Sequence, residues 1–183
     1  NPFYDFKSHY EVDPHPQWKD KKNQKKIKCS NAEIGCTISH LQVWKDIVKK
    51  KTPYTLILED DFFFDRNFQE KFIQSWFEVP GNFDLFYLSI YPSAHGFTWD
   101  TYSENIIELH NGVWWLSGYI LSYEGAKKLI DNFPVCGPGD MWINHQFKNM
   151  SVYATKFNLI GQRPDTTSDN IYSFESIYKY WKD

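Results

Sequence analysis

Long apolar runs are missing from this chain, and so is a strong excess of charge of either sign. No stretch reaches the roughly 18–20 apolar residues that a membrane-spanning helix needs, and the start, Asn1, shows no signal peptide. The 20 Lys and Arg residues nearly balance the 23 Asp and Glu residues, so no global field favours nucleic acid. We expect a soluble domain that neither crosses a membrane nor binds nucleic acid, of undetermined oligomeric state.

Cysteine is scarce as well. The three cysteines, Cys29, Cys36 and Cys136, are odd in number and have no metal-type spacing, so they predict neither a disulfide framework nor a zinc site. One pair could close in an oxidising compartment. Without a signal peptide, this cysteine usage favours a cytoplasmic location over a secreted one, with the compartment itself undetermined.

The length of 183 residues predicts a single domain over residues 1–183, long enough to bury a core. Residues 1–28 are polar and interrupted by prolines, so we expect irregular structure there without a strand. Aromatic residues make up 19% of the chain, which favours a stacking-rich binding surface as well as a core.

Beyond residue 28 the pattern predicts alternating helices and strands, which is typical of an α/β fold. Ser30 and Glu33 form a capping box before a helix that ends at the lysines 49–51. The apolar face of this helix is predicted from Ile34, Ile38, Leu41 and Val48, with Trp44 and Ile47 beside it, whereas Ser39 and His40 lie off that stripe.

The remaining expected elements follow from local signals. They are a buried strand 54–59, a helix 67–77 with Phe68, Phe72, Ile73 and Trp76 inward, a strand 84–90, a loop 92–104, a hairpin of strands 106–109 and 113–116 turning at Asn111-Gly112, a strand 119–122, a helix 124–133, a helix 141–149 with Asp140 as its N-cap, and a strand 152–157.

Three consecutive acids, Glu59, Asp60 and Asp61, follow the strand 54–59. Strand ends of an α/β sheet lie at the edge where such sheets bind ligands. Adjacent carboxylates repel each other, and a divalent cation that bridges to a phosphate is the common compensation. A solvated acidic turn is the alternative interpretation.

Six segments together form a specific pattern. They are residues 33–40 followed by Leu41, Val43 and Trp44, the Leu56–Asp61 segment, residues 84–88, residues 118–129, Asp140 after Pro138-Gly139, and Gln162 with Ser168-Asp169. These segments resemble glycosyltransferase family 25, which includes lipopolysaccharide-type glycosyltransferases and collagen galactosyltransferases. The matches cover roughly residues 30–170 in the family's order, and they are specific jointly rather than singly. The family opens with an apolar nucleotide-binding strand that residues 1–28 do not show, so that strand is either missing or this member is short.

The resemblance implies a GT-A type fold, a mixed sheet flanked by helices. It also implies inverting transfer of a hexose, galactose or glucose, from a uridine diphosphate (UDP) sugar to a hydroxyl of a glycan or protein, with Mn²⁺ (or Mg²⁺) as cofactor. The implied metal ligands are Asp61, Glu59 and Asp169, and Asp140 is the implied general base. The implied donor contacts are Glu59, Asp60, Ser39, His40 and Gln162.

The loop 92–104 offers a weaker acceptor platform in His95 and Trp99, because sugars stack on aromatic faces. Several alternatives stay open. Asp140 could be an ordinary N-cap, which would lower its pKa, His40 a structural residue, and Asp169 part of a plain turn. For the whole chain, the alternatives are a catalytically inactive sugar- or nucleotide-binding module of the same fold and a carboxylate-based metal phosphoesterase.

Overall fold

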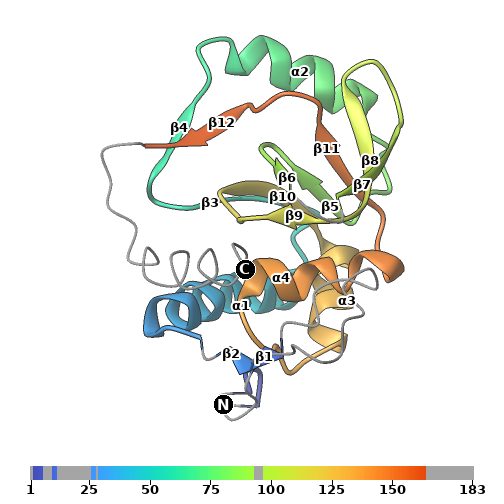
Figure 1. The fold of residues 1–183 in the computed structure, drawn as a ribbon. Helices are drawn as coiled ribbons and strands as arrows, with labels where there is room; N and C mark the ends of the chain where they lie inside the picture. Colours follow the sequence, from blue (N-terminus) through green and yellow to red (C-terminus); the bar gives the residue numbers. More distant parts are fainter. Residues whose placement is uncertain (1, 6–9, 12–25, 28, 93–96, 164–183) are drawn as a thin grey trace.

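A mixed six-stranded sheet organises the protein (Figure 1). The structure, a computed structural model, describes residues 2–5, 10–11, 26–27, 29–92 and 97–163. The strand order is β3-β10-β5-β11-β8-β7, in which β5 and β11 run parallel and the other neighbouring pairs run antiparallel. In that order the strands are Tyr54–Leu58, Gly118–Ser122, Leu85–Tyr87, Val152–Thr155, Ile106–Asn111 and Thr98–Thr101.

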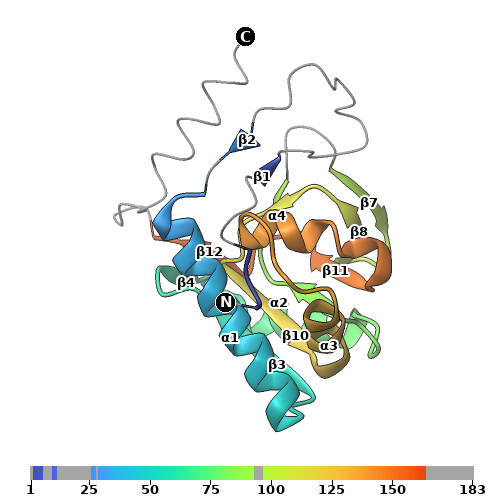
Figure 2. The same cartoon turned by 90° about the horizontal axis from the view of Figure 1, so that it is seen from below.

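Helices lie on both faces of this sheet, as expected for the α/β class. One face carries α1 (Asn31–Lys50), α3 (Tyr123–Asp131) and α4 (Gly139–Asn144), which lie together in Figure 2. The other face carries α2 (Phe68–Glu78). In the described part of the chain, every helix is too short or too polar to span a bilayer.

Short pairs of strands complete the described structure. They are β1 (Tyr10–Glu11) with β2 (Lys26–Ile27), β4 (Phe62–Phe64) with β12 (Ile160–Gln162), and β6 (Tyr91–Pro92) with β9 (Val113–Trp114), and a 3₁₀ turn, η1, covers Phe147–Asn149. Two of these strands, β1 and β2, fall within the segment that was predicted to lack strands. Another, β12, lies in a segment for which no strand was predicted.

Helix α1 begins where the capping box predicts. The Ser30 oxygen accepts the Glu33 N–H at 3.1 Å, and the Glu33 carboxylate accepts the Ser30 N–H at 2.7 Å. The buried face differs from the predicted stripe, because Ile34, Ile38 and Val48 are half-buried at its margins. The buried residues are Thr37, His40, Leu41, Trp44 and Ile47. His40 therefore lies on the buried face, which corrects the prediction that it lies off the stripe.

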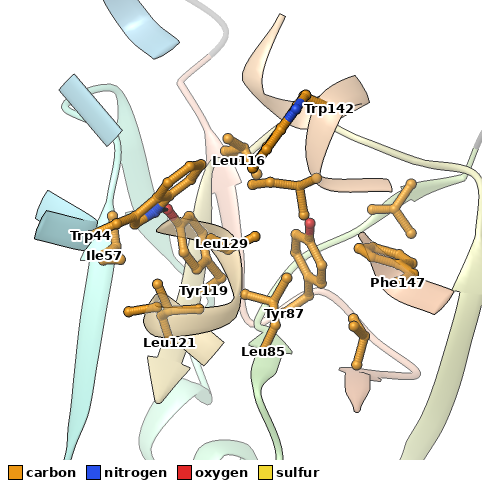
Figure 3. Close-up of a cluster of buried hydrophobic side chains, with 14 of the residues drawn as sticks. Trp44, Ile57, Leu85, Tyr87, Leu116, Tyr119, Leu121, Leu129, Trp142 and Phe147 are labelled. Atoms are coloured by element: carbon orange, nitrogen blue, oxygen red, sulfur yellow. Dashed lines mark hydrogen bonds between the residues drawn. The ribbon is translucent and has the colours of Figure 1, made fainter. Parts of the chain in front are cut away.

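The core is divided by the sheet into two layers, because successive residues of a strand face opposite sides. Leu85 and Tyr87 of β5 pack under α1, α3 and α4, together with Tyr119 of β10 and Trp44 (Figure 3). Phe86 of β5 packs on the side of α2. Each fully buried side chain of this size contributes about 1.5–3 kcal/mol, so both layers hold the sheet in place.

Strand β3 is at one edge of the sheet, which corrects the prediction of a fully buried strand. Tyr54 is 41% exposed and Leu56 is 46% exposed, whereas Ile57 is buried. Helix α2 is also less buried than predicted, since Ile73 is 47% exposed and Trp76 is 36% exposed. Of the apolar residues of α2, Phe68 and Phe72 pack against the buried cluster on this side of the sheet.

The predicted hairpin at Asn111-Gly112 does not form. Strand β8 pairs with β7 and β11 instead, and β9 pairs with β6. The Asn144 side chain of α4 accepts the backbone N–H groups of Gly112 and Val113, so these donors are occupied where a hairpin would use them. Two further predictions are corrected. The segment 92–104, predicted to be a loop, contains β7. The single helix predicted over 141–149 is instead divided between α4 and η1.

Candidate active site

The three acids form a bend between β3 and β4. The Glu59 N–H donates to the Ser117 carbonyl at 3.1 Å, and the Phe62 N–H donates to the Glu59 carbonyl at 3.4 Å. Strand β12 closes the bend from the other side, because the Arg163 N–H donates to the Asp61 carbonyl at 2.8 Å. The acids thus lie at the carboxyl end of β3, as the sequence predicted for a ligand-binding edge.

The Glu59 carboxylate points back toward α1, where both of its oxygens have partners. Oε1 accepts the Cys36 thiol at 3.5 Å and lies 3.7 Å from Nε2 of His40. Oε2 accepts the amide of Gln162 at 3.2 Å. Burial, followed by the charge of Glu59, raises the pKa of Cys36 to about 12, so the free thiol keeps its proton at neutral pH.

A buried hydrogen-bond chain fixes the imidazole of His40. Its Nδ1 lies 2.8 Å from the hydroxyl of Tyr119, which also accepts the indole N–H of Trp44 at 2.9 Å. Tyr119 is fully buried, and desolvation raises its pKa above the ordinary value, so the hydroxyl stays protonated. His40 is therefore held with Nε2 toward Glu59. It is a buried structural residue that also faces the acidic bend.

Asp61 has a carboxylate oxygen without a hydrogen-bond partner. Its Oδ1 is buried without a hydrogen-bond partner in the described structure. Burial raises the pKa of Asp61, and the charges of Glu59 and Asp60 raise it further. A half-buried carboxylate with one unpartnered oxygen, beside two other acids, matches the oxygen ligands that hard divalent cations prefer. Asp60 is exposed at the rim.

Asp140 lies at the second position of α4, and not at the N-cap, which is Pro138. Thr37 of α1 accepts the Gly139 N–H at 2.9 Å and so positions the start of this helix. Asp140 accepts the N–H of Trp115 at 3.0 Å and that of Met141 at 2.8 Å. Burial nevertheless raises its pKa, with a contribution from the charge of Glu59, which contradicts the lowered pKa expected for an N-cap.

An aromatic cleft lies beside the acidic bend. Trp115 has φ 68°, an uncommon backbone conformation for a residue other than glycine, of the kind that costs about 1–3 kcal/mol and occurs at functional sites. Its ring packs against the ring of Tyr91, with centroids 3.9 Å apart and ring planes tilted by 34°. The cleft has a volume of about 510 Å³, within the range of small-molecule sites. Its lining includes both rings, Asp65, Ser117, Gln162 and Arg163.

The structure does not unite all of the predicted site residues. It brings together Glu59, Asp60, Asp61, His40 and Gln162 around the bend. Ser39 is exposed on α1 and donates to the carbonyl of Gly35 at 3.1 Å. Trp99 is on β7, at the opposite edge of the sheet from β3, roughly 24 Å away at the usual strand spacing. His95 and Asp169 lie outside the described residues.

Cys36, Tyr91 and Trp115, which were not predicted from the sequence, join the site beside the predicted His40. Cys36 and His40 are four positions apart on α1, a spacing that places two side chains on one helix face and that could have indicated a ligand pair. The spacing of the cysteines alone does not reveal a pair that combines a cysteine with a histidine. Nothing local marked Tyr91 and Trp115, because their ring contact depends on the pairing of β6 with β9.

Comparison with known proteins places the chain in a family. Residues 7–143 match the family described as "Glycosyltransferase family 25 (LPS biosynthesis protein)". The chain belongs to this family, and its mixed sheet with helices on both faces is a GT-A-like fold. The family match confirms the resemblance inferred from the motifs, and the chain is accordingly a glycosyltransferase-type protein.

The relatives carry the names of transferases, and one of these names includes the words "Probable inactive". The chain is 34% identical over 127 residues, 63% of its length and 13% of the relative's, to "Procollagen lysyl hydroxylase and glycosyltransferase" of Acanthamoeba polyphaga mimivirus. It is 28% identical over 119 residues (57% and 17%) to "Procollagen galactosyltransferase 2" of Homo sapiens. It is 28% identical over 114 residues (58% and 18%) to "Probable inactive glycosyltransferase 25 family member 3" of Bos taurus. The chain thus spans less than a fifth of each of these relatives.

Proposed function

We propose that this chain is an inverting, metal-dependent glycosyltransferase domain. It would move a hexose, galactose or glucose, from a UDP-sugar to a hydroxyl of a glycan or protein. The observation that carries this proposal is the buried, unpartnered Oδ1 of Asp61 among three carboxylates, at the carboxyl end of β3 and next to the aromatic cleft. The name of the human relative supports a hexose such as galactose.

Asp61 is the proposed ligand of the divalent cation, Mn²⁺ (or Mg²⁺). When bound, the cation supplies positive charge that stabilises the leaving diphosphate. Glu59 was predicted to be a ligand of this cation too, but its carboxylate points toward Cys36 and His40 of α1, so we assign it to positioning Gln162 rather than to the cation at Asp61. Asp60 and Gln162 remain the proposed donor contacts, because both lie at the rim of the bend.

Asp140 is the proposed general base of a single displacement. A carboxyl whose pKa is raised toward neutral accepts a proton more readily, which suits a base that works near neutral pH. Its two oxygens accept two backbone N–H groups and keep lone pairs free for the acceptor hydroxyl. Trp115 connects this residue to the cleft, so Trp115 and Tyr91 replace Trp99 in our proposal for the acceptor platform.

Donor binding and turnover test the proposal separately. Calorimetry with UDP should show binding that requires Mn²⁺, and a screen of UDP-sugars should show Mn²⁺-dependent hydrolysis or transfer. Asp61→Asn should lose the Mn²⁺-dependent binding. Asp140→Asn should keep the binding and lower the transfer rate by about 10²-fold or more, as expected when a general base is removed. Asp46→Asn, on the exposed side of α1, is the control and should change neither.

Two outcomes would overturn the assignment. The first is a chain that binds no UDP, with or without Mn²⁺, and turns over no UDP-sugar. This result would exclude a transferase role for this chain. Mn²⁺-dependent binding without any turnover would favour the alternative, a catalytically inactive binding module of the same fold. The name of the Bos taurus relative, which contains the words "Probable inactive", supports keeping this alternative.

A further inference from the structure

A thiol, an imidazole and a carboxylate meet between α1 and the end of β3. They belong to Cys36, His40 and Glu59. We propose that these three side chains form a binding site for a borderline-soft divalent cation of the zinc class, distinct from the hard-cation site proposed at Asp61. The inference is independent of the proposed transferase activity, because it depends only on the arrangement of these ligand atoms.

The distances suit zinc. The three ligand atoms all lie within 4.8 Å of one another, with Sγ of Cys36 at 3.5 Å and Nε2 of His40 at 3.7 Å from Oε1 of Glu59. Bonds of about 2.3 Å to sulfur and about 2.0–2.2 Å to nitrogen and oxygen, at tetrahedral angles, separate ligand atoms by roughly 3.4–3.6 Å. The two distances to Glu59 are therefore close to those of a zinc site, and the separation of Cys36 and His40 is short enough for one ion to draw both ligands in.

The supporting contacts also match those of a metal site. Cys36 and His40 are one helical turn apart, so α1 presents both ligands on the same face. The Tyr119 hydroxyl binds Nδ1 of His40 at 2.8 Å and leaves Nε2 for the metal. Ligating histidines commonly use their second nitrogen in this way, which fixes the orientation of the ring.

The ligand types select the metal. A thiolate with an imidazole favours Zn²⁺ over Mn²⁺ or Mg²⁺, which prefer oxygen ligands. On binding, the Cys36 S–H bond breaks, its proton passes to solvent and a sulfur–metal bond forms without any change of oxidation state. Three protein ligands leave the fourth tetrahedral position to water or another small ligand.

Cobalt spectroscopy provides the test, because Co²⁺ replaces Zn²⁺ and absorbs through thiolate-to-metal charge transfer. The full chain should show this near-ultraviolet band on titration with Co²⁺, and Zn²⁺ but not Mg²⁺ should abolish it. Cys36→Ser should lose the band. His40→Gln should keep a thiolate but weaken Zn²⁺ binding, measured by competition with a chromogenic chelator, by at least about tenfold. Cys136→Ser is the matched control and should retain both the band and the affinity.

Three results would overturn the proposal. The first is a wild-type chain without the band. The second is a band that persists in Cys36→Ser, and the third is an unchanged Zn²⁺ affinity in His40→Gln. Far-ultraviolet circular dichroism identifies any variant that fails to fold. Should Cys36→Ser fail in this way, the affinity of folded His40→Gln decides the question, because its loss supports the site and its retention refutes it.

Discussion

Asp61 combines partial burial with two like-charged neighbours, an arrangement that opposes the charged form. Its pKa is raised from the ordinary value of 3.8, chiefly by burial. The folded state then holds the proton more tightly than the unfolded state does. As pH rises from about 3.8 through the raised pKa, the unfolded state loses its proton first, so the free energy of unfolding falls across that window.

Asp61→Asn should therefore stabilise the metal-free protein at neutral pH, because the amide carries no charge. Urea unfolding at pH 7 should give a larger free energy of unfolding for the variant, and the advantage should disappear as the pH approaches 3.8. Mn²⁺ should stabilise the wild type and not the variant, since only the wild type offers the ligand.

The control for this prediction is Asp46→Asn on the surface of α1. Lys50 lowers the pKa of Asp46, so removing this charge should slightly destabilise the protein, the opposite direction. An Asp61→Asn variant that is less stable than the wild type at pH 7 without metal would show that the hydrogen bonds from the backbone and Gln162 outweigh burial and the charges of Glu59 and Asp60, contrary to this prediction.

At the scale of elements, α4 organises the chain around Trp115 and Asp140. Asn144, the last residue of α4, accepts the N–H groups of Gly112 and Val113 and donates to the carbonyls of Val113 and Asp140. One side chain thereby directs β9 away from β8. It also holds the segment that leads to Trp115, whose N–H binds Asp140.

Asn144→Ala should lower the free energy of unfolding by about 2–3 kcal/mol, because several part-buried backbone groups lose their partner. Urea denaturation measures this change. Asn132→Ala at the end of α3 is the matched control. Asn132 makes one exposed hydrogen bond, to the Lys128 carbonyl, so its loss should cost about 0.5 kcal/mol or less. Equal effects of the two substitutions would contradict the role of Asn144 in the turn.

At the scale of the whole molecule, Gly118 lets β12 cross close to the sheet. A Cβ at this position would lie 2.0 Å from Cδ1 of Ile160 and 2.9 Å from Cδ2 of Leu58. Both contacts are shorter than van der Waals packing allows. The absence of a side chain at Gly118 therefore permits β12 to pack against β10 and β3, and β12 carries Gln162 to Glu59.

Gly118→Ala should destabilise the protein by about 1–3 kcal/mol, the usual range for overpacking. Thermal unfolding measures the change. Gly35→Ala is the control, because no atom lies within 4 Å of the added Cβ at this exposed helical position. There alanine should stabilise α1 by about 0.5–1 kcal/mol. A neutral Gly118→Ala would mean that the ends of the Ile160 and Leu58 side chains can move aside at little cost.

Local sequence signals were sufficient to predict an element whose position is set by the residues within it. The Ser30 and Glu33 capping box placed the start of α1, and the short apolar run at residues 119–121 placed β10. The acidic bend after β3 was also predicted, because strand ends and consecutive acids are visible along the chain. These features depend on helical capping, on side-chain periodicity and on charge repulsion, all of which act over a few residues.

Only the tertiary structure decided which of these elements meet. The Asn111-Gly112 turn signal was overridden by Asn144, a residue 32 positions from Gly112. Cys36 reaches Glu59 across 23 positions, and Trp115 reaches Asp140 across 25. The sequence by itself therefore determined the capped helix, the core strands and the acids at the edge of the sheet. The folded chain determined the partners of those acids, because hydrogen bonds and packing between distant segments exist only once the sheet and helices have assembled.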